Sequence, residues 1–159
     1  MFSWHSLLVQ GKRPKKKKQK AGPSKWPKLL RISEEMKQWS AMLEQELASW
    51  PGVTAKPMFG MAGYYRRGGI FAAVPRTRAL GSVNAVIFRF DPMPPGLLRR
   101  ALDDRRIGAE RETPGARWYS FEVRSGTDLR DLLWWLHRAC QAAKAPERKR
   151  RRGSKRVRR

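Results

Sequence analysis

Cysteine, histidine and long apolar runs are scarce in this chain of 159 residues. A single cysteine, Cys140, excludes an intramolecular disulfide, so a reducing compartment is the simplest fit. The two histidines, His5 and His137, have no Cys-x-x-Cys pair or other ligand cluster beside them, so we expect neither a metal site nor a cofactor. No apolar run approaches the roughly 20 residues of a membrane-spanning helix, and we expect no transmembrane segment.

Acidic residues are also few. The chain has 13 Asp and Glu against 36 Lys and Arg, a formal net charge of +23. Residues 1–28 hold nine Lys and Arg and no acid, and residues 144–159 hold ten Lys and Arg and one acid. The middle, with 17 basic and 12 acidic residues, has an ordinary balance. This distribution predicts one domain over residues 29–145 between two basic arms, 1–28 and 146–159.

Each arm contains a run of like charge that buries no apolar side chain, and we expect both arms to be disordered in isolation. Such runs attract polyanions, of which nucleic acid, DNA or RNA, is the most common. The alternative is that the tails serve only solubility or localisation. The predicted phosphate-binding residues of the arms are Lys15, Lys16, Lys17, Lys18, Arg148, Lys149, Arg150, Arg151 and Arg152.

The middle of the chain reads as an α+β domain. Apolar residues recur at helical spacing from Ile32 to Trp50, with Ser33 as the predicted N-cap of this helix. They recur again between the predicted N-cap Thr127 and Pro146. The order is α-β-β-β-(short α)-β-α, which predicts a four-stranded, mainly antiparallel sheet with the helices packed mainly on one face. The predicted strands cover residues 58–65, 70–74, 84–90 and 117–124, and the predicted short helix covers residues 96–102.

Residues 57–74, PMFGMAGYYRRGGIFAAV, read as a β-hairpin that turns at residues 66–69. This stretch resembles the signature hairpin of the TfoX N-terminal domain family (TfoX/Sxy-like, with a YjbR-like fold), which carries an MFGG-x-G-x-Y…G-x-x-FA pattern. Met61 departs from the pattern, since the family usually has a second glycine there. The residues that match the motif are Met58, Phe59, Gly60, Gly63, Tyr65, Gly68 and Phe71.

The resemblance extends more weakly over residues 33–144 and excludes both arms. It implies a bacterial, cytoplasmic protein with a regulatory or accessory role, because the family is associated with regulation of competence genes. The family has no catalytic motif that could be transferred to this chain. Together with the basic arms, the resemblance favours association with the nucleoid or with RNA.

The residues themselves also give no catalytic constellation. Cys140 is predicted on the apolar face of the last helix, where a thiol is buried and inert, so it forms no pair with His137. Asp103 and Asp104 are followed by Arg105 and Arg106, which reads as a solvated charge patch. The predicted function is therefore non-enzymatic.

The last helix carries a second candidate for binding. Arg130, Trp134 and Arg138 follow at intervals of four residues and form one stripe, roughly opposite the leucine face. An exposed Trp between two arginines suits a nucleic-acid surface or a protein interface. The alternatives are that Trp134 is satisfied locally by its arginines or is covered by another segment.

Two further interpretations stay open. Arg76 and Arg78 flank the hydroxyl of Thr77 on a short loop, which is either a phosphate site or two solvated arginines. The chain is either a nucleic-acid-associated protein or a protein-interaction adaptor. In the second case Trp134, Trp135 and the hairpin edge would bind a protein partner or a second copy of the chain.

Overall fold

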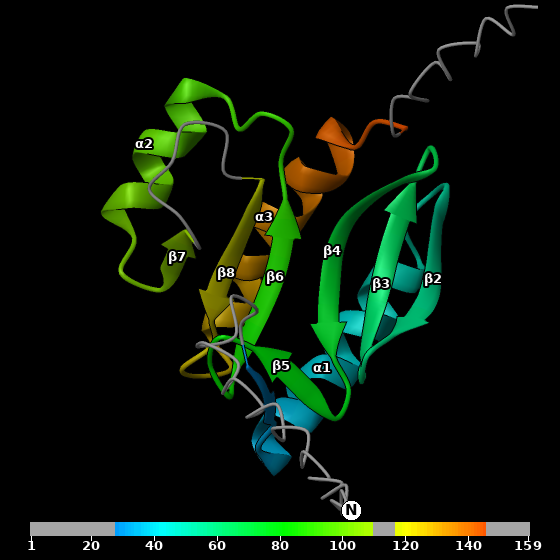
Figure 1. Ribbon diagram of the computed structural model, residues 1–159, viewed down its shortest axis with the longest axis vertical. Coiled ribbons are helices and arrows are strands. Elements are labelled where there is room, and N and C mark those ends of the chain that lie inside the picture. The colour runs from blue at the N-terminus through cyan, green and yellow to red at the C-terminus, as the bar shows by residue number, and fades with distance from the viewer. Residues whose placement is uncertain (1–27, 110–116, 146–159) are drawn as a thin grey trace, which may run out of the picture.

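Antiparallel strands make up most of the computed structural model, which describes residues 28–109 and 117–145 (Figure 1). Residues 1–27 and 146–159, which hold all nine predicted phosphate-binding residues of the arms, lie outside the described residues. The helices are α1 (Glu34–Ala48), α2 (Pro95–Asp103) and α3 (Asp128–Ala142). The strands are β1 (Leu29–Arg31), β2 (Val53–Met58), β3 (Met61–Arg66), β4 (Gly69–Pro75), β5 (Arg78–Leu80), β6 (Ala85–Arg89), β7 (Ile107–Ala109) and β8 (Trp118–Glu122).

Six of the strands form one sheet in the order β2-β3-β4-β6-β8-β7, and every neighbouring pair is antiparallel. The other two, β1 and β5, form a separate two-stranded sheet that crosses the lower end of the first (Figure 1). The α+β class and the antiparallel pairing are as predicted. The predicted number of four strands is wrong, because β1, β2, β5 and β7 were not expected.

The missed strands have a common physical reason. Three of them have only three residues, too few to show an alternating pattern. β2 has six residues, VTAKPM, but its four central residues are exposed, so little apolar alternation marks it. It lies at the edge of the sheet, the position at which Pro57 is tolerated because no further strand requires its missing N–H.

Both hairpins close through two-residue turns in which both residues have positive φ. In the β3–β4 turn, Arg67 has a φ of 53° and Gly68 a φ of 76°, so the predicted turn is confirmed. In the β2–β3 turn, Phe59 has a φ of 48° and Gly60 a φ of 81°. Phe59, expected in a strand, is therefore a turn residue.

The two long helices begin differently. Ser33 caps α1 as predicted, since its Oγ accepts a hydrogen bond from the N–H of Met36 at 3.1 Å. Thr127 precedes α3, but its hydroxyl makes no cap hydrogen bond to the helix. Instead the carboxylate of Asp128 accepts hydrogen bonds from the N–H groups of Arg124 at 2.8 Å and Ser125 at 3.2 Å.

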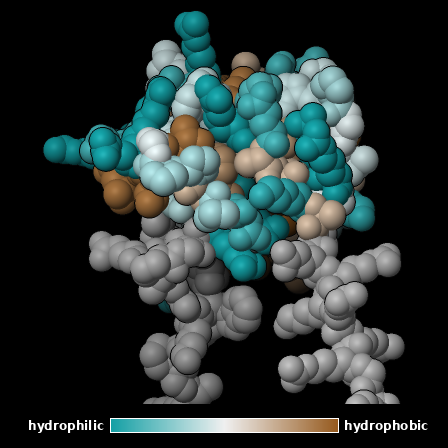
Figure 2. All heavy atoms as spheres, turned by 90° about the horizontal axis from the view of Figure 1, so that it is seen from above, coloured by the Kyte–Doolittle hydropathy of each residue, from teal (hydrophilic) through white to brown (hydrophobic). Residues whose placement is uncertain are grey.

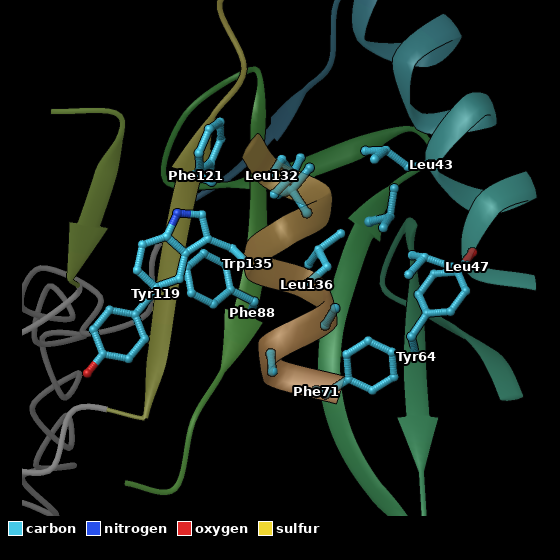
Figure 3. Close-up of a cluster of buried hydrophobic side chains, with 14 of the residues drawn as sticks. Leu43, Leu47, Tyr64, Phe71, Phe88, Tyr119, Phe121, Leu132, Trp135 and Leu136 are labelled. Atoms are coloured by element: carbon cyan, nitrogen blue, oxygen red, sulfur yellow. The ribbon is translucent and has the colours of Figure 1, made fainter. Parts of the chain in front are cut away.

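Both long helices pack on one face of the six-stranded sheet and lie behind it in Figure 1. Figure 3 shows α3 between the two halves of the core, with Leu132, Trp135 and Leu136 directed at the sheet. The ring of Trp135 stacks on Phe88 of β6, with centroids 5.8 Å apart. None of the described helices combines the length and apolar character that a membrane span requires.

Candidate nucleic-acid interface

The predicted stripe lies on the outer side of α3, but its aromatic ring is less accessible than expected. Arg130 and Arg138 are exposed, whereas Trp134 is half-buried and packs against the core. The guanidinium carbon of Arg138 lies 5.1 Å from the centroid of the Trp134 ring, and that of Arg100 in α2 lies 4.1 Å from it. The expectation of an exposed Trp is therefore corrected: α2 supplies a second cation to the ring.

Arg100 is the residue that sequence reasoning missed at this surface. Its contact with Trp134 depends on where the segment between β6 and α2 directs α2, and no local pattern encodes that direction. The result is a group of two guanidiniums around one indole, in which the cations, more than the ring, face solvent.

Trp135, the other proposed interface residue, is a core residue. Only 2 % of its surface is exposed, and it makes an edge-to-face contact with Trp134 at 5.0 Å between centroids. It packs inward because the buried face of α3 is wider than the stripe formed by its leucines and includes Trp135. Trp135 therefore offers no contact area to a partner without unfolding of the core.

Many cations of the domain have no carboxylate beside them. Within the described ranges, Glu44 pairs with Arg76 at 2.8 Å and Asp91 pairs with Arg89 at 3.2 Å. Lys37, Arg117 and Arg124 also lie within ion-pair distance of a carboxylate, and Arg106 belongs to a cluster described below. No described carboxylate lies within ion-pair distance of the other twelve described cations. These are Lys28, Arg31, Lys56, Arg66, Arg67, Arg78, Arg99, Arg100, Arg105, Arg130, Arg138 and Lys144.

One end of the domain has a mostly hydrophilic surface. Figure 2 shows the end of the domain that is uppermost in Figure 1, where hydrophilic side chains cover most of the visible face and apolar patches are small and separate. The domain as a whole carries an excess of unneutralised cations, which is typical of proteins that meet a polyanion.

The loop between β4 and β5 is built differently from a phosphate-binding loop. The backbone N–H groups of Arg76, Thr77 and Arg78 all point at one acceptor, the carbonyl oxygen of Gly60, at 2.9, 2.9 and 3.2 Å. They are therefore not available to a phosphate. Because Glu44 neutralises Arg76, Arg78 is the only one of the two predicted arginines whose side chain is available to a phosphate.

The residues of the hairpin motif have separate roles in the structure. Gly60 and Gly68 occupy positive-φ turn positions, and Phe71 is the unpaired residue of a bulge between the Tyr64–Ala72 and Tyr65–Ile70 pairs. Gly63 lies on the sheet face opposite the helices, where an added Cβ would lie 3.3 Å from the side chains of Ile70 and Tyr65. Apart from the two exposed turn glycines, the motif residues that remain on the surface are Phe59, which is exposed, and Met58 and Tyr65, which are half-buried.

The charge patch at residues 103–106 contains an organised ion cluster, where the sequence suggested solvated side chains. Arg106 binds Asp104 through two side-chain hydrogen bonds, Nε to Oδ1 at 2.9 Å and Nη2 to Oδ2 at 2.7 Å, and its backbone N–H donates to Oδ1 at 3.0 Å. It also reaches Asp128 at 2.8 Å and Asp131 at 3.0 Å on α3, and its guanidinium lies 4.8 Å from the Phe121 ring centroid. The cluster ties the loop before β7 to the first turn of α3.

The cluster shifts the titration of its members. The hydrogen bond from Arg106 lowers the pKa of Asp104, and the same bond raises the pKa of Arg106. Burial alone would raise the pKa of Asp128, but the N–H of Arg124 and the guanidinium of Arg106 outweigh it and hold that pKa below its usual range.

Replacement of Arg106 by glutamine is expected to lower the free energy of unfolding by about 2 kcal/mol at neutral pH, because charged hydrogen bonds are lost. Carboxyls with lowered folded-state pKa values stabilise the fold fully above their ordinary pKa and lose that effect as the pH falls through the lowered value. The deficit of the variant should therefore shrink at about pH 3. Urea unfolding at both pH values measures it. Arg105→Gln, an exposed neighbour, is the control, and an equal deficit at both pH values would contradict the assignment.

Cys140 and His137 do not act together. Burial raises the pKa of the Cys140 thiol, which makes its thiolate scarce at neutral pH. His137 is exposed and meets the ring of Trp50 edge-on, with centroids 5.4 Å apart. Over residues 28–109 and 117–145, no three His, Cys, Asp or Glu side chains lie close enough together to hold a metal ion.

Comparison of the chain with protein-family models, with curated proteins and with solved structures finds no match. The resemblance to the TfoX N-terminal domain family therefore stays a prediction based on the hairpin motif.

Proposed function

We propose that this protein is a non-enzymatic nucleic-acid-associated protein with a regulatory or accessory role. The two basic arms bind phosphates with little sequence preference, and the folded domain adds the Arg100–Trp134–Arg138 group and Arg130 on the outer side of α3. The proposed location is the cytoplasm, on the nucleoid or on RNA. The hairpin motif supports a TfoX-like domain with this role.

One observation carries the proposal, namely the segregation of charge. The arms, residues 1–28 and 146–159, hold 18 of the 36 Lys and Arg of the chain and only one of its 13 acids. The domain between them adds eleven cations that have no described carboxylate within ion-pair distance, namely those given above except Lys28. A single nucleic-acid strand can contact both sets, because the stripe on α3 runs toward the start of the C-terminal arm.

The test is a salt titration of oligonucleotide binding by the full-length protein. The variant replaces the nine arm residues Lys15–Lys18 and Arg148–Arg152 by glutamine. Each phosphate contact contributes a slope of about 0.7 to 0.9 in log affinity against log salt, so the variant should lose several units of slope. Fluorescence anisotropy with duplex DNA, single-stranded DNA and RNA measures it.

Two outcomes decide between the parts of the proposal. If the arm variant still binds nucleic acid, with a shallower slope of log affinity against log salt, the domain surface contributes to binding. Adding Arg130→Gln and Arg138→Gln to that variant should then remove up to two further phosphate contacts. If the wild-type protein binds none of the three nucleic acids at physiological salt, the proposed function is wrong.

The adaptor function remains the second candidate, and α2 favours it. Leu98 and Leu102 lie one turn apart on this helix with 38 % and 73 % of their surfaces exposed, a small apolar strip open to a protein partner or a second copy of the chain. The adaptor function is favoured if the wild-type protein binds no nucleic acid and Leu102→Asn abolishes its self-association or its binding to a defined protein partner.

A further inference from the structure

The tip of the β2–β3 hairpin carries a residue that its backbone does not favour. Phe59 is 80 % exposed, and its φ of 48° lies in the left-handed region. The first position of such a two-residue turn is usually Asn, Asp or Gly, because a bulky side chain is strained there. Burial does not explain the phenylalanine, since its ring faces solvent. A costly residue that the fold does not require points to a role in binding.

The tip is held rigidly against the β4–β5 loop. The Gly60 carbonyl accepts the three backbone hydrogen bonds described above, and the Thr77 hydroxyl donates a fourth at 3.5 Å. A Cβ on Gly60 would lie 2.8 Å from Thr77 Oγ1 and 3.1 Å from Arg78 Cβ, so only glycine lets the two segments approach this closely. Phe59 is thus presented beside residues 77 and 78 on a pre-organised turn.

Two arginines stand opposite each other at the same place. Arg31 of β1 and Arg78 of β5 are direct cross-strand partners, and both are exposed. Directly opposed like charges destabilise a strand pair, and their Cβ atoms lie about 5 Å apart. Neither has a described carboxylate within ion-pair distance. One phosphate group between the two guanidiniums would remove this repulsion.

We infer that the β2–β3 tip is a binding site for single-stranded nucleic acid, in which an unpaired base stacks on Phe59 and an adjacent phosphate binds between Arg31 and Arg78. The inference rests on the proposed function and deepens it, since it assigns a strand type and a site on the folded domain. β1 leads directly back into the N-terminal arm, so the arm and the site can contact consecutive phosphates of one strand.

The chemistry favours a single strand over a duplex. An exposed ring at a hairpin tip has room for the open face of a base, whereas the bases of a duplex are already stacked on each other. The two arginines beside the ring oppose a neutral apolar occupant, because its docking would desolvate them without compensation.

The test replaces Phe59 by asparagine in the full-length protein. Asparagine suits the turn, so the variant should unfold at no lower a temperature than the wild type. Its affinity for a single-stranded oligonucleotide should fall about tenfold, as expected for the loss of one stacked base, and its affinity for duplex should stay within twofold. Phe59→Tyr, which keeps the ring, should retain the wild-type affinity for the single strand.

Met42→Gln is the matched control, because it removes another exposed apolar side chain, on α1, that belongs to neither candidate surface and should change neither affinity. The loss at Phe59 should persist at raised salt, where the phosphate contacts of the arms weaken but stacking does not. The double variant Arg31→Gln/Arg78→Gln should reduce the single-strand salt slope by about 0.7, the value for one phosphate, and Arg105→Gln should not.

A single strand that contains 5-bromouracil gives an independent readout, since light cross-links this base to a stacked ring. A cross-link at Phe59 supports the site, and cross-links only elsewhere overturn it. Two other results overturn the site while the proposed function stands. In the first, Phe59→Asn loses equal affinity for single strand and duplex. In the second, the wild-type protein binds the single strand and Phe59→Asn binds it equally well. A wild-type protein that binds no nucleic acid overturns both.

Discussion

Replacement of Trp135 by alanine is expected to lower the free energy of unfolding by about 3–5 kcal/mol, the range for large-to-small changes of buried aromatic residues. The ring is stacked on Phe88, which itself stacks on Tyr119 at 5.8 Å between centroids (Figure 3). Because α3 and β6 meet through these rings, Trp135→Ala would leave a cavity between the helix and the sheet. Urea unfolding followed by far-ultraviolet circular dichroism measures the loss.

The neighbouring residue provides the control. Trp134 is half-buried and its contacts include two arginines, so Trp134→Ala should cost about 1–2 kcal/mol, less than the change at Trp135. Equal costs at the two positions would show that the helix buries a different face from the one described. If Trp135→Ala left stability unchanged but abolished capture of a protein partner, Trp135 would belong to an interface instead of the core.

The parts of the fold that the sequence predicts are those with a local physical signal. α1 and α3 repeat apolar residues at helical spacing, and Ser33 and Pro51 mark the limits of α1. The β3–β4 turn is encoded by Arg67-Gly68, with glycine at the second left-handed position. By contrast, β7 and the β1–β5 pair have three residues per strand and exist only because a neighbouring strand supplies hydrogen bonds.

The candidate binding surfaces also include parts that the local sequence predicts and parts that depend on tertiary contacts. The basic runs are evident from composition, because repulsion between like charges needs no tertiary structure to be recognised. The contact of Arg100 with Trp134 and the opposition of Arg31 and Arg78 arise from elements far apart in the chain. The position of Phe59 has a related cause. Met58-Phe59 has the composition of a strand, and only the pairing of Met58 with Met61 makes Phe59 a turn residue.

A second large loss of stability is expected from a substitution at Gly69, which begins β4 directly after the β3–β4 turn. A Cβ at this position would overlap the carbonyl oxygen of Lys144 and lie 2.7 Å from its carbonyl carbon. Backbone atoms cannot rotate away as a side chain does, so the segment after α3 would have to shift. Arg66 binds the same region, since its Nη1 donates to the carbonyl of Cys140 at 3.4 Å. The end of α3 thus rests directly on the hairpin.

Gly69→Ala is therefore expected to lower the free energy of unfolding by about 2–3 kcal/mol, as overpacking does, and urea unfolding measures it. Gly96→Ala is the control, because an added Cβ there meets no atom within 4 Å and alanine suits the first turn of α2. That variant should be as stable as the wild type or slightly more so. A Gly69→Ala protein within about 0.5 kcal/mol of the wild type would mean that the chain beyond α3 yields freely, and that its contact with the hairpin does not hold the helix in place.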